Sequence, residues 1–430
     1  MKQRSKWLGT SLLIPALLLT ACAPERDAQG VIGGDSTGGD PGKPESLSIW
    51  TSDLELAVEA YGDITEQFTE ETGIEVNLRG MTIDEQTEGM SLDGPGGRGP
   101  DLFFQPHDRI GDIALQGLAV PIDITEEQRN QYEEAALDAM TYEGELYGLP
   151  AVQETYALYY NKSITETPPE TLEELETLAQ EETDASQDEY GFLMEGINFY
   201  FTYPFMTAFG GYVFGENEDG TYNIDDIGLN EAGAVEGAEM LQSWFDEGYL
   251  PRGVNADIMN GLFEEGNVGA VVSGPWSLRD YQQALGEDNL GVAPLPTTDE
   301  GEALRSFSGV QGWLVSSFID VERRYWAEEL AFYMTNEESS TSYVETTGHI
   351  PGNKAVVESD LIQEDPFLSG FAEQVRRSEA MPNPPEINQV WDPMEDAQQF
   401  ISEGDDAEEV LNEAVEEINV NIEMQAPPER

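Results

Sequence analysis

The sequence predicts an α/β fold arranged in two lobes. Residues 47–430 are too many for one hydrophobic core, because single cores stop growing at about 250–300 residues. Hydrophobic residues make up 39% of the chain and aromatic residues 10%, which is ordinary for globular protein. Stretches with strand and helix periodicity alternate along the chain, and sheets built this way are mostly parallel and bind ligands at the carboxyl ends of their strands.

The first half of the chain alternates strands and helices. A short apolar run over 47–50 predicts a strand, apolar residues at helical spacing over 54–68 predict a helix, and alternation over 74–78 predicts a second strand. Residues 101–104 predict a further strand, and residues 110–118 predict a helix.

The same patterns continue to the C-terminus. Residues 156–160 predict a strand, and residues 168–179 and 321–335 predict helices. Residues 395–403 and 407–424 predict a C-terminal pair of helices.

The first 21 residues predict a lipoprotein signal peptide. Basic residues at 2, 4 and 6 precede an apolar run over 7–21 that is too short to span a bilayer. The run ends in Leu-Thr-Ala-Cys, and Cys22 is the only cysteine of the chain. This lipobox predicts a mature chain that begins at a lipidated Cys22 on the extracellular face of a bacterial cell membrane. The alternative is an ordinary signal peptide with an incidental cysteine, but a lone extracellular thiol would be unusual.

Residues 22–46 predict a flexible tether behind that anchor. They are rich in glycine, aspartate and proline and contain few apolar residues. A flexible chain of this length spans roughly 25–30 Å, so the folded part can stand off the membrane. With one cysteine, the mature chain can form no internal disulfide, and its fold depends on its own core.

The chain is very acidic. It has 86 Asp and Glu against 19 Lys and Arg, a formal net charge of −67, and five lysines. Nucleic acid is disfavoured as a partner, because its phosphates would be repelled. Repulsion among this many acidic groups is screened near molar salt, where the Debye length is about 3 Å. The composition therefore favours a halophilic or haloalkaliphilic source. The alternative is a solvated acidic surface that reflects no adaptation to salt.

The sequence favours neither a metal site nor a cofactor. The only two histidines, His107 and His349, are far apart, and no second cysteine is available to complete a zinc site.

Aromatic residues gather beside polar groups instead. Five of the eight residues over 198–205 are aromatic, and Trp276 and Trp391 lie next to Gly-Pro and Asp-Pro pairs. Sugars present flat CH faces that stack on rings and hydroxyls that carboxylates, amides and guanidinium groups bind. For any single ring a place in the core remains the alternative, because aromatic residues dominate cores generally.

Several motifs resemble those of one family. Residues 99–111, GPDLFFQPHDRIG, resemble the GPDI-hydrophobic-HDR segment of the maltose and maltodextrin binding proteins, the sugar receptors of ABC importers. Further matching segments occur in the same order at 147–150 with Glu154, 160–162, 200–204, 210–212, 273–276, and 381–385 leading to Trp391. The resemblance covers about residues 47–424.

This resemblance implies a two-lobed periplasmic-binding-protein-like fold of type II, with mixed sheets flanked by helices and a hinge between the lobes. Lobe 1 would hold residues 47–152 and 297–350, and lobe 2 residues 153–296 and 351–425. It implies a monomer without cofactor or catalytic residues that captures maltose or maltodextrin by hinge closure and delivers it to the permease subunits of an ABC transporter.

The resemblance also implies a set of carbohydrate-binding residues. Asp108, Arg109 and Glu154 would hydrogen-bond sugar hydroxyls, and Tyr200, Trp276 and Trp391 would stack on sugar rings. Phe199 and Met381 would contact the same ligand.

The chain departs from the family pattern at four places. Residues 51–55 lack the lysine that often follows the first strand, so Asp53 or Glu55 would face the sugar. Gln105, where a tryptophan can occur, and Asn198, where a glutamate can occur, are expected among the carbohydrate-binding residues, and Glu395 stands where an arginine can occur. These departures leave the chain length and type of the oligosaccharide open.

Two other classes of protein are open on the residues alone. A secreted glycoside hydrolase would also place rings and two carboxylates, about 5–10 Å apart, around a sugar. A surface adhesin would show repeats or long extended segments, and the sequence shows neither.

Overall fold

The computed structural model describes residues 42–217 and 221–425. The predicted signal peptide, Cys22 and most of the tether lie outside the described residues. Within the described part, most strands belong to two sheets, each with its own hydrophobic clusters, and no helix there is long and apolar enough to cross a membrane.

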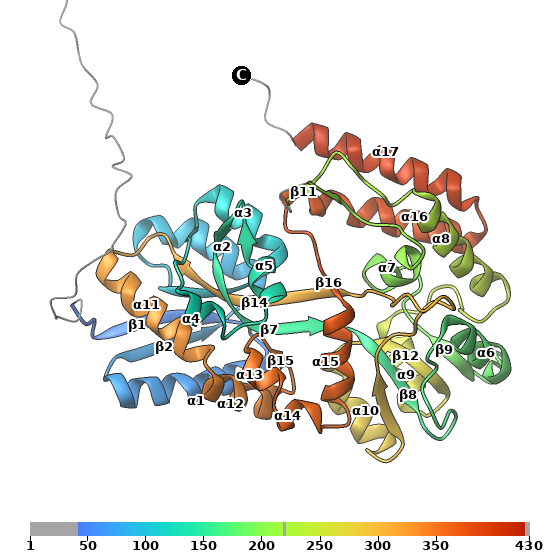
Figure 1. The fold of residues 1–430 in the computed structure, drawn as a ribbon, viewed down its shortest axis with the longest axis horizontal. Helices are drawn as coiled ribbons and strands as arrows, with labels where there is room; N and C mark the ends of the chain where they lie inside the picture. The colour runs from blue at the N-terminus through green and yellow to red at the C-terminus, as the bar shows by residue number, and fades with distance from the viewer. Residues whose placement is uncertain (1–41, 218–220, 426–430) are drawn as a thin grey trace, which may run out of the picture. The chain divides into compact units, whose positions relative to one another are not determined.

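The first sheet has eight strands. Its main path runs β15-β7-β14-β3-β1-β2, and β4 and β16 both pair with β14 (Figure 1). The bounds are β1 (Ser46–Thr51), β2 (Glu75–Gly80), β3 (Leu102–Pro106), β4 (Ala119–Val120), β7 (Gly148–Thr155), β14 (Phe307–Ser316), β15 (Ile350–Pro351) and β16 (Glu379–Ala380).

Helices cover this sheet because their apolar residues recur on one side. Helix α1 (Glu55–Thr72) buries Tyr61, Ile64 and Phe68 at helical spacing and ends at Gly73, whose φ of 72° suits a residue without a Cβ. Helix α2 (Ile83–Asp93) begins at a capping box made by Thr82 and Glu85. The remaining helices of this region are α3 (Ile110–Gln116), α4 (Glu126–Arg129), α5 (Glu134–Ala139), α11 (Val321–Met334), α12 (Glu337–Thr347) and α13 (Lys354–Val357).

The core of the first sheet centres on Trp313 of β14. Its ring lies 4.9 Å from that of Tyr61 and 5.1 Å from that of Phe104, both edge-on. All three side chains are fully buried. Edge-on rings at this separation add about 0.5–1.5 kcal/mol to the gain from burial alone.

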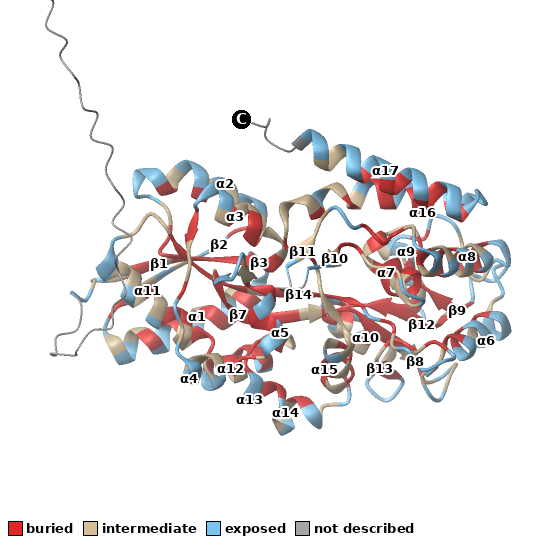
Figure 2. Cartoon of the chain, turned by 45° about the horizontal axis from the view of Figure 1, so that its top comes forward, coloured by how far each residue is buried: buried red, intermediate tan, exposed pale blue. Residues whose placement is uncertain are grey.

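The second sheet has four strands in the order β13-β8-β12-β9. Successive residues of β8 (Ala157–Asn161) enter different clusters: Leu158 packs with Phe192 on one face, and Tyr159 packs with Tyr281 on the other. This sheet is therefore covered on both faces, and Figure 2 shows its strands almost entirely buried. The other strands are β9 (Tyr190–Leu193), β12 (Val268–Ser273) and β13 (Leu290–Ala293).

Helices and two short hairpins complete the described fold. The helices of the second region are α6 (Leu172–Glu182), α7 (Phe199–Thr207), α8 (Ala232–Asp246), α9 (Ala256–Glu264), α10 (Leu278–Leu285), α14 (Asp360–Gln363), α15 (Leu368–Arg377), α16 (Trp391–Glu403) and α17 (Ala407–Gln425). The hairpins pair β5 (Thr141–Tyr142) with β6 (Glu145–Leu146) and β10 (Gly215–Glu216) with β11 (Tyr222–Asn223). Short 3-10 helices are η1 (Gly94–Gly96), η2 (His107–Arg109), η3 (Pro275–Ser277) and η4 (Pro385–Gln389).

The α/β class and each of the predicted elements are confirmed, with shifts of a few residues at their ends. The largest shifts are of four residues: α1 ends at Thr72 rather than at residue 68, α6 begins at Leu172 rather than at residue 168, and α16 begins at Trp391 rather than at residue 395. The expectation of mostly parallel sheets is wrong. β14 pairs antiparallel with β3, β4 and β7, and β8 pairs antiparallel with both of its neighbours. The chain leaves the first sheet after β7 and enters it again at β14. These two strands therefore run in opposite directions, and they cannot both be parallel to β1 and β3.

The chain passes from the first sheet to the second between β7 and β8, and returns between β13 and β14. Side chains tie these two passages together, because Thr155 Oγ1 lies 2.6 Å from Ser306 Oγ and donates to the Phe307 carbonyl at 2.8 Å. Further crossings occur between α13 and α14, between α15 and β16, and after β16 towards α16. The residue boundaries of two lobes around these passages stay a prediction.

Candidate functional site

One edge of the first sheet carries several of the predicted site residues. β1 runs parallel to both β2 and β3, so the carboxyl ends of the three strands lie at the same edge. Asp53 and Glu55 follow β1, and Asp108 and Arg109 follow β3. Asp53 and Glu55 are exposed, whereas Asp108 and Arg109 are partly buried.

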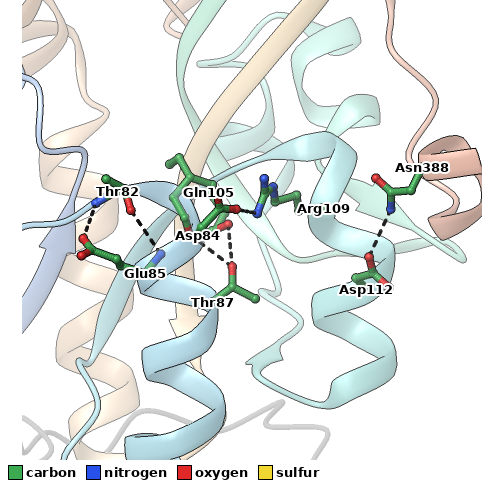
Figure 3. Close-up of polar contacts among 9 residues, drawn as sticks. Thr82, Asp84, Glu85, Thr87, Gln105, Arg109, Asp112 and Asn388 are labelled. Atoms are coloured by element: carbon green, nitrogen blue, oxygen red, sulfur yellow. Dashed lines mark hydrogen bonds and ion pairs between the residues drawn. The ribbon is translucent and has the colours of Figure 1, made fainter. Parts of the chain in front are cut away.

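The first turn of α2 holds Arg109 and Gln105 (Figure 3). Arg109 Nη1 donates to Asp84 Oδ1 at 2.6 Å. Gln105 is fully buried; its Nε2 donates to the Ile83 carbonyl at 3.2 Å, and its Oε1 accepts from Thr87 Oγ1 at 3.3 Å. The Gln105 amide thus supports α2, while the Arg109 guanidinium keeps further donors for a ligand.

His107 joins the HDR segment to the segment around Met381. Its Nε2 lies 2.7 Å from the Met381 carbonyl, and its Nδ1 accepts from the Val310 amide at 3.0 Å. Burial lowers the pKa of His107, with the nearby Asp108 carboxylate acting in the opposite direction. The ring is therefore neutral, with its proton on Nε2, and it ties the chain just before Asp108 to the backbones of Val310 and Met381.

The two segments also approach at a glycine. A Cβ on Gly111 would lie 2.6 Å from the Asn383 carbonyl, so a larger residue would push the segments apart. Asn383 Nδ2 donates to the Ala139 and Thr141 carbonyls, and Asn388 Nδ2 lies 3.5 Å from Asp112 Oδ2 (Figure 3). The two motifs that resembled one family in the sequence are thus packed directly against each other.

The corresponding edge of the second sheet carries the aromatic residues. β9 and β12 run parallel, so the residues that follow them share one edge. Asn198 begins α7 and accepts from the Tyr200 amide at 3.1 Å, which sets the first turn of that helix. Trp276 follows β12 and is 49% exposed. Its ring lies over Gly274, where a Cβ would be 2.1 Å from the indole.

Tyr200 lies in a partly buried, acidic environment. Burial raises the pKa of its hydroxyl, and the charges of Glu154 and Asp108 raise it further. Phe307 stacks on Tyr200 with centroids 6.2 Å apart, and its ring lies 6.0 Å from that of Trp391.

One predicted residue, Phe199, and two acidic residues that were not predicted to bind sugar occupy different surroundings. Phe199 is fully buried and packs against Trp391 at 5.9 Å, so its contact with a ligand would need a change in the structure around it. Glu395 is exposed on α16. Burial raises the pKa of Glu195, whereas hydrogen bonds from Asn198 and the Ala256 amide lower it by a smaller amount.

Met381 lies against a separate cavity. This cavity of about 1220 Å³ is lined by the rings of Tyr142, Tyr203, Tyr212 and Tyr222, and among the predicted site residues of the described chain it contains Met381 alone. Glu379 also lines this cavity, and its carboxyl group accepts a hydrogen bond from the Tyr203 hydroxyl. Across residues 42–217 and 221–425, no group of three or more histidine, aspartate, glutamate or cysteine side chains could hold a metal ion.

Three polar residues of this region escaped the sequence predictions: Glu195, Gln311 and His349. Gln311 Nε2 donates to Glu154 Oε2 at 2.7 Å, and His349 Nδ1 lies 3.3 Å from Glu154 Oε1. Glu195 could have been found from its place directly after β9. Gln311 and His349 become visible only when their strands are paired.

The fold and these two edges define a solute-binding protein. Residues 63–369 match the family of bacterial extracellular solute-binding proteins, and the chain belongs to this family. The two-lobed fold predicted from the motifs is confirmed by solved structures. The chain is similar to a cyclo/maltodextrin-binding protein complexed with maltotetraose, with 38% identity, 91% of this chain and 100% of the other covered, and a TM-score of 0.85. It is similarly related to an extracellular solute-binding protein of Staphylococcus aureus in complex with maltose, with 40% identity, 90% and 100% coverage, and a TM-score of 0.82.

Curated relatives extend the comparison to function. A galactooligosaccharide-binding protein of Bacillus subtilis is 33% identical over 93% of this chain and 93% of its own. A maltodextrin-binding protein of the same organism is 33% identical over 83% of this chain and 85% of its own. The resemblance to maltodextrin-binding proteins stated from the motifs is thus confirmed.

Proposed function

We propose that this protein is the substrate-binding protein of a carbohydrate ABC importer and that it binds maltose or maltodextrin. The observation that carries this proposal is the likeness to the maltotetraose complex, at 38% identity and a TM-score of 0.85 over 91% of the chain. Carboxylates, a guanidinium group and exposed or partly buried rings at the two edges are the chemistry that a sugar requires.

The proposed binding residues have different roles at the two edges. Asp108, Arg109 and Glu154 bind hydroxyl groups, with Asp53 or Glu55 added from the loop after β1. Tyr200, Trp276 and Trp391 supply flat surfaces for sugar rings. The other predicted residues, Gln105, Asn198, Phe199 and Met381, support these groups from behind or contact the ligand after closure.

Hinge closure is the proposed mechanism. A sugar held by the first edge gains contact with the rings of the second edge when the predicted lobes close around it. Ligand binding therefore favours the closed form in proportion to the contacts that exist only in that form. The permease subunits would recognise this closed form.

The type of oligosaccharide is tested by calorimetric titration in high salt. Maltose to maltoheptaose, cyclodextrin, trehalose and a galactooligosaccharide form the panel. We expect heat of binding from the maltodextrin series. The galactooligosaccharide-binding relative supports a second candidate, and binding of galactooligosaccharide without maltodextrin would replace the first.

We propose that binding leaves the sugar unchanged. Incubation with maltotetraose should produce no shorter sugars, as judged by chromatography. Release of shorter products that depends on Glu154 or Asp108 would instead favour a glycoside hydrolase.

We propose that lipidation of Cys22 anchors a monomer at the extracellular face of the cell membrane. A similar protein of Streptococcus pneumoniae, 26% identical over 97% of this chain, is named a maltooligosaccharide ABC transporter solute-binding lipoprotein. Replacement of Cys22 by alanine should move the expressed protein from the membrane fraction to the soluble fraction. Equal membrane retention of both proteins would contradict the anchor.

We propose that the protein works in high salt. With a net charge of −67, raising NaCl from about 0.1 to 2 M should raise the melting temperature by shortening the Debye length from about 10 Å to below 3 Å. A melting temperature that does not respond to salt would contradict a halophilic origin.

A further inference from the structure

Two neighbouring strands of the first sheet, and the residue that precedes a third, place polar side chains on one face. β7 lies between β14 and β15, and both neighbours run antiparallel to it. Glu154 is opposite Gly309, and Gln311 is opposite Val152. Ile350 is opposite Gln153, so the preceding residue, His349, comes level with Glu154. Because alternate residues of a strand share a face, Gln311, Glu154 and His349 all point to the same side.

We propose that Gln311 and His349 are positioning residues that fix the Glu154 carboxylate for a sugar hydroxyl. This inference rests on the proposed function, and it adds two residues that the family motifs of the sequence did not contain. Neither residue needs to touch the ligand.

Each oxygen of Glu154 has its own partner. Oε2 accepts from Gln311 Nε2 at 2.7 Å, and Oε1 lies 3.3 Å from His349 Nδ1. The side chains of His349 and Glu154 are 13% and 19% exposed, so water competes little for these bonds. A glutamate side chain that is free in solution loses much rotational freedom on binding a ligand, and here the two partners impose that loss before the ligand arrives.

The carboxylate keeps room and capacity for a ligand. Each oxygen has accepted one bond and retains acceptor capacity for another. A Cβ on Gly309, directly across from Glu154, would meet only the Glu154 carbonyl oxygen within 4 Å, at 3.9 Å. Gly309 thus leaves open space beside a fixed carboxylate.

The imidazole of His349 has two separable roles. It can donate from Nδ1 to Glu154, and its ring contacts that of Tyr343, with centroids 6.4 Å apart. His349→Phe keeps a ring and removes the donor. His349→Asn removes the ring and keeps an amide donor near the place of Nδ1.

Calorimetric titration of these variants with maltotetraose tests the inference. We expect His349→Phe to bind about tenfold more weakly than the unchanged protein and His349→Asn to recover affinity to within about threefold, since one hydrogen bond to a charged group is involved. Equal weakening of both variants, or no weakening in His349→Phe, would overturn the assignment. Melting temperatures taken in parallel show whether each variant is folded.

A second variant keeps the test independent of the histidine. Gln311→Met has nearly the same shape but no donor, and we expect a loss of about tenfold. In a Glu154→Ala background both His349→Phe and Gln311→Met should have little further effect, because they act through the missing carboxylate. Full additivity in that background would contradict positioning.

Failure of this inference is distinguishable from failure of the proposed function. If the unchanged protein binds none of the maltodextrins, the proposed function fails. If it binds them and the Phe and Met variants bind equally well, the function stands and the positioning role is wrong.

Discussion

The two edges of the candidate site are held in place in different ways. At the first edge, polar groups depend on named hydrogen-bond partners: Arg109 on Asp84, Glu154 on Gln311, and the backbone beside Asp108 on His107. At the second edge, rings are held by packing, as Tyr200 and Trp391 are by Phe307. A hydrogen bond needs its donor and acceptor aligned, whereas a stacked ring tolerates small displacements. The first edge is therefore suited to reading hydroxyl positions, and the second to supplying contact area.

The largest expected effect is at the second edge. Trp276 is 49% exposed, so Trp276→Ala should leave the melting temperature nearly unchanged. Loss of its contact area should cost about 2–3 kcal/mol of binding, or roughly 30- to 150-fold in affinity for maltotetraose. Trp391→Ala is the companion variant, but Trp391 also packs on Phe199 and Phe307, so its stability should fall as well. Unchanged affinity in both variants would contradict the prediction that sugar rings stack at the second edge.

A smaller effect is expected from one hydroxyl-binding group of the first edge. Asp108→Asn keeps the shape and removes the charge, and we expect affinity for maltotetraose to fall roughly tenfold. A hydrogen bond to a charged group contributes about 1.5–3 kcal/mol, and the amide keeps a neutral bond of about 0.5–1.5 kcal/mol, so only the difference is lost. Selectivity between maltotetraose and a galactooligosaccharide should change more in Asp108→Asn than in Trp276→Ala. An equal change in selectivity in both variants would contradict the hypothesis that the first edge recognises hydroxyl positions and the second edge supplies contact area.

The buried histidine of the first edge should make stability depend on pH. Burial lowers the pKa of His107, so below about pH 6.5 the unfolded chain binds a proton that the folded protein does not. The free energy of unfolding should therefore fall as pH drops from about 7.5 to 5.5, and this loss should be smaller in His107→Gln. Thermal melts across that range compare the two slopes. Burial raises the pKa of Glu379, which acts in the opposite direction in both proteins and cancels from the comparison. Parallel slopes would contradict a neutral His107.

The smallest effect is expected from the exposed ion pair at α2. Asp84 and Arg109 are 77% and 38% exposed, and surface pairs contribute about 0–1 kcal/mol. Asp84→Asn should therefore weaken maltotetraose binding no more than about threefold, and less at high salt. A loss larger than that of Asp108→Asn would show that Asp84 itself takes part in binding.

Much of the fold could be predicted because it follows local patterns. The apolar spacing over 54–68 predicted α1, and the alternation over 74–78 predicted β2. The direction of β14 could not be predicted, since a strand has the same pattern whether its neighbours are parallel or antiparallel. Its antiparallel pairing with β3 and β7 makes the first sheet mixed, and the antiparallel pairing of β8 with β12 and β13 makes the second sheet mixed.

Site residues could be predicted where they belong to a family motif. They could not be predicted where strand pairing brings residues of distant segments into contact. The HDR segment led to Asp108 and Arg109, but the burial of Gln105 and Phe199 depends on neighbours from distant segments. His349 and Gln311 carry no signal of their own in the sequence.

By itself, the sequence determined the α/β class, the order of its elements, the acidic charge and the family motifs, because these properties depend on residue type and on spacing along one stretch of chain. Only the tertiary structure decided which polar groups hold one another. Gln311 and Glu154 come from β14 and β7, His349 directly precedes β15, and antiparallel pairing sets which of their side chains share a face. Spacing along the chain carries no information about that pairing.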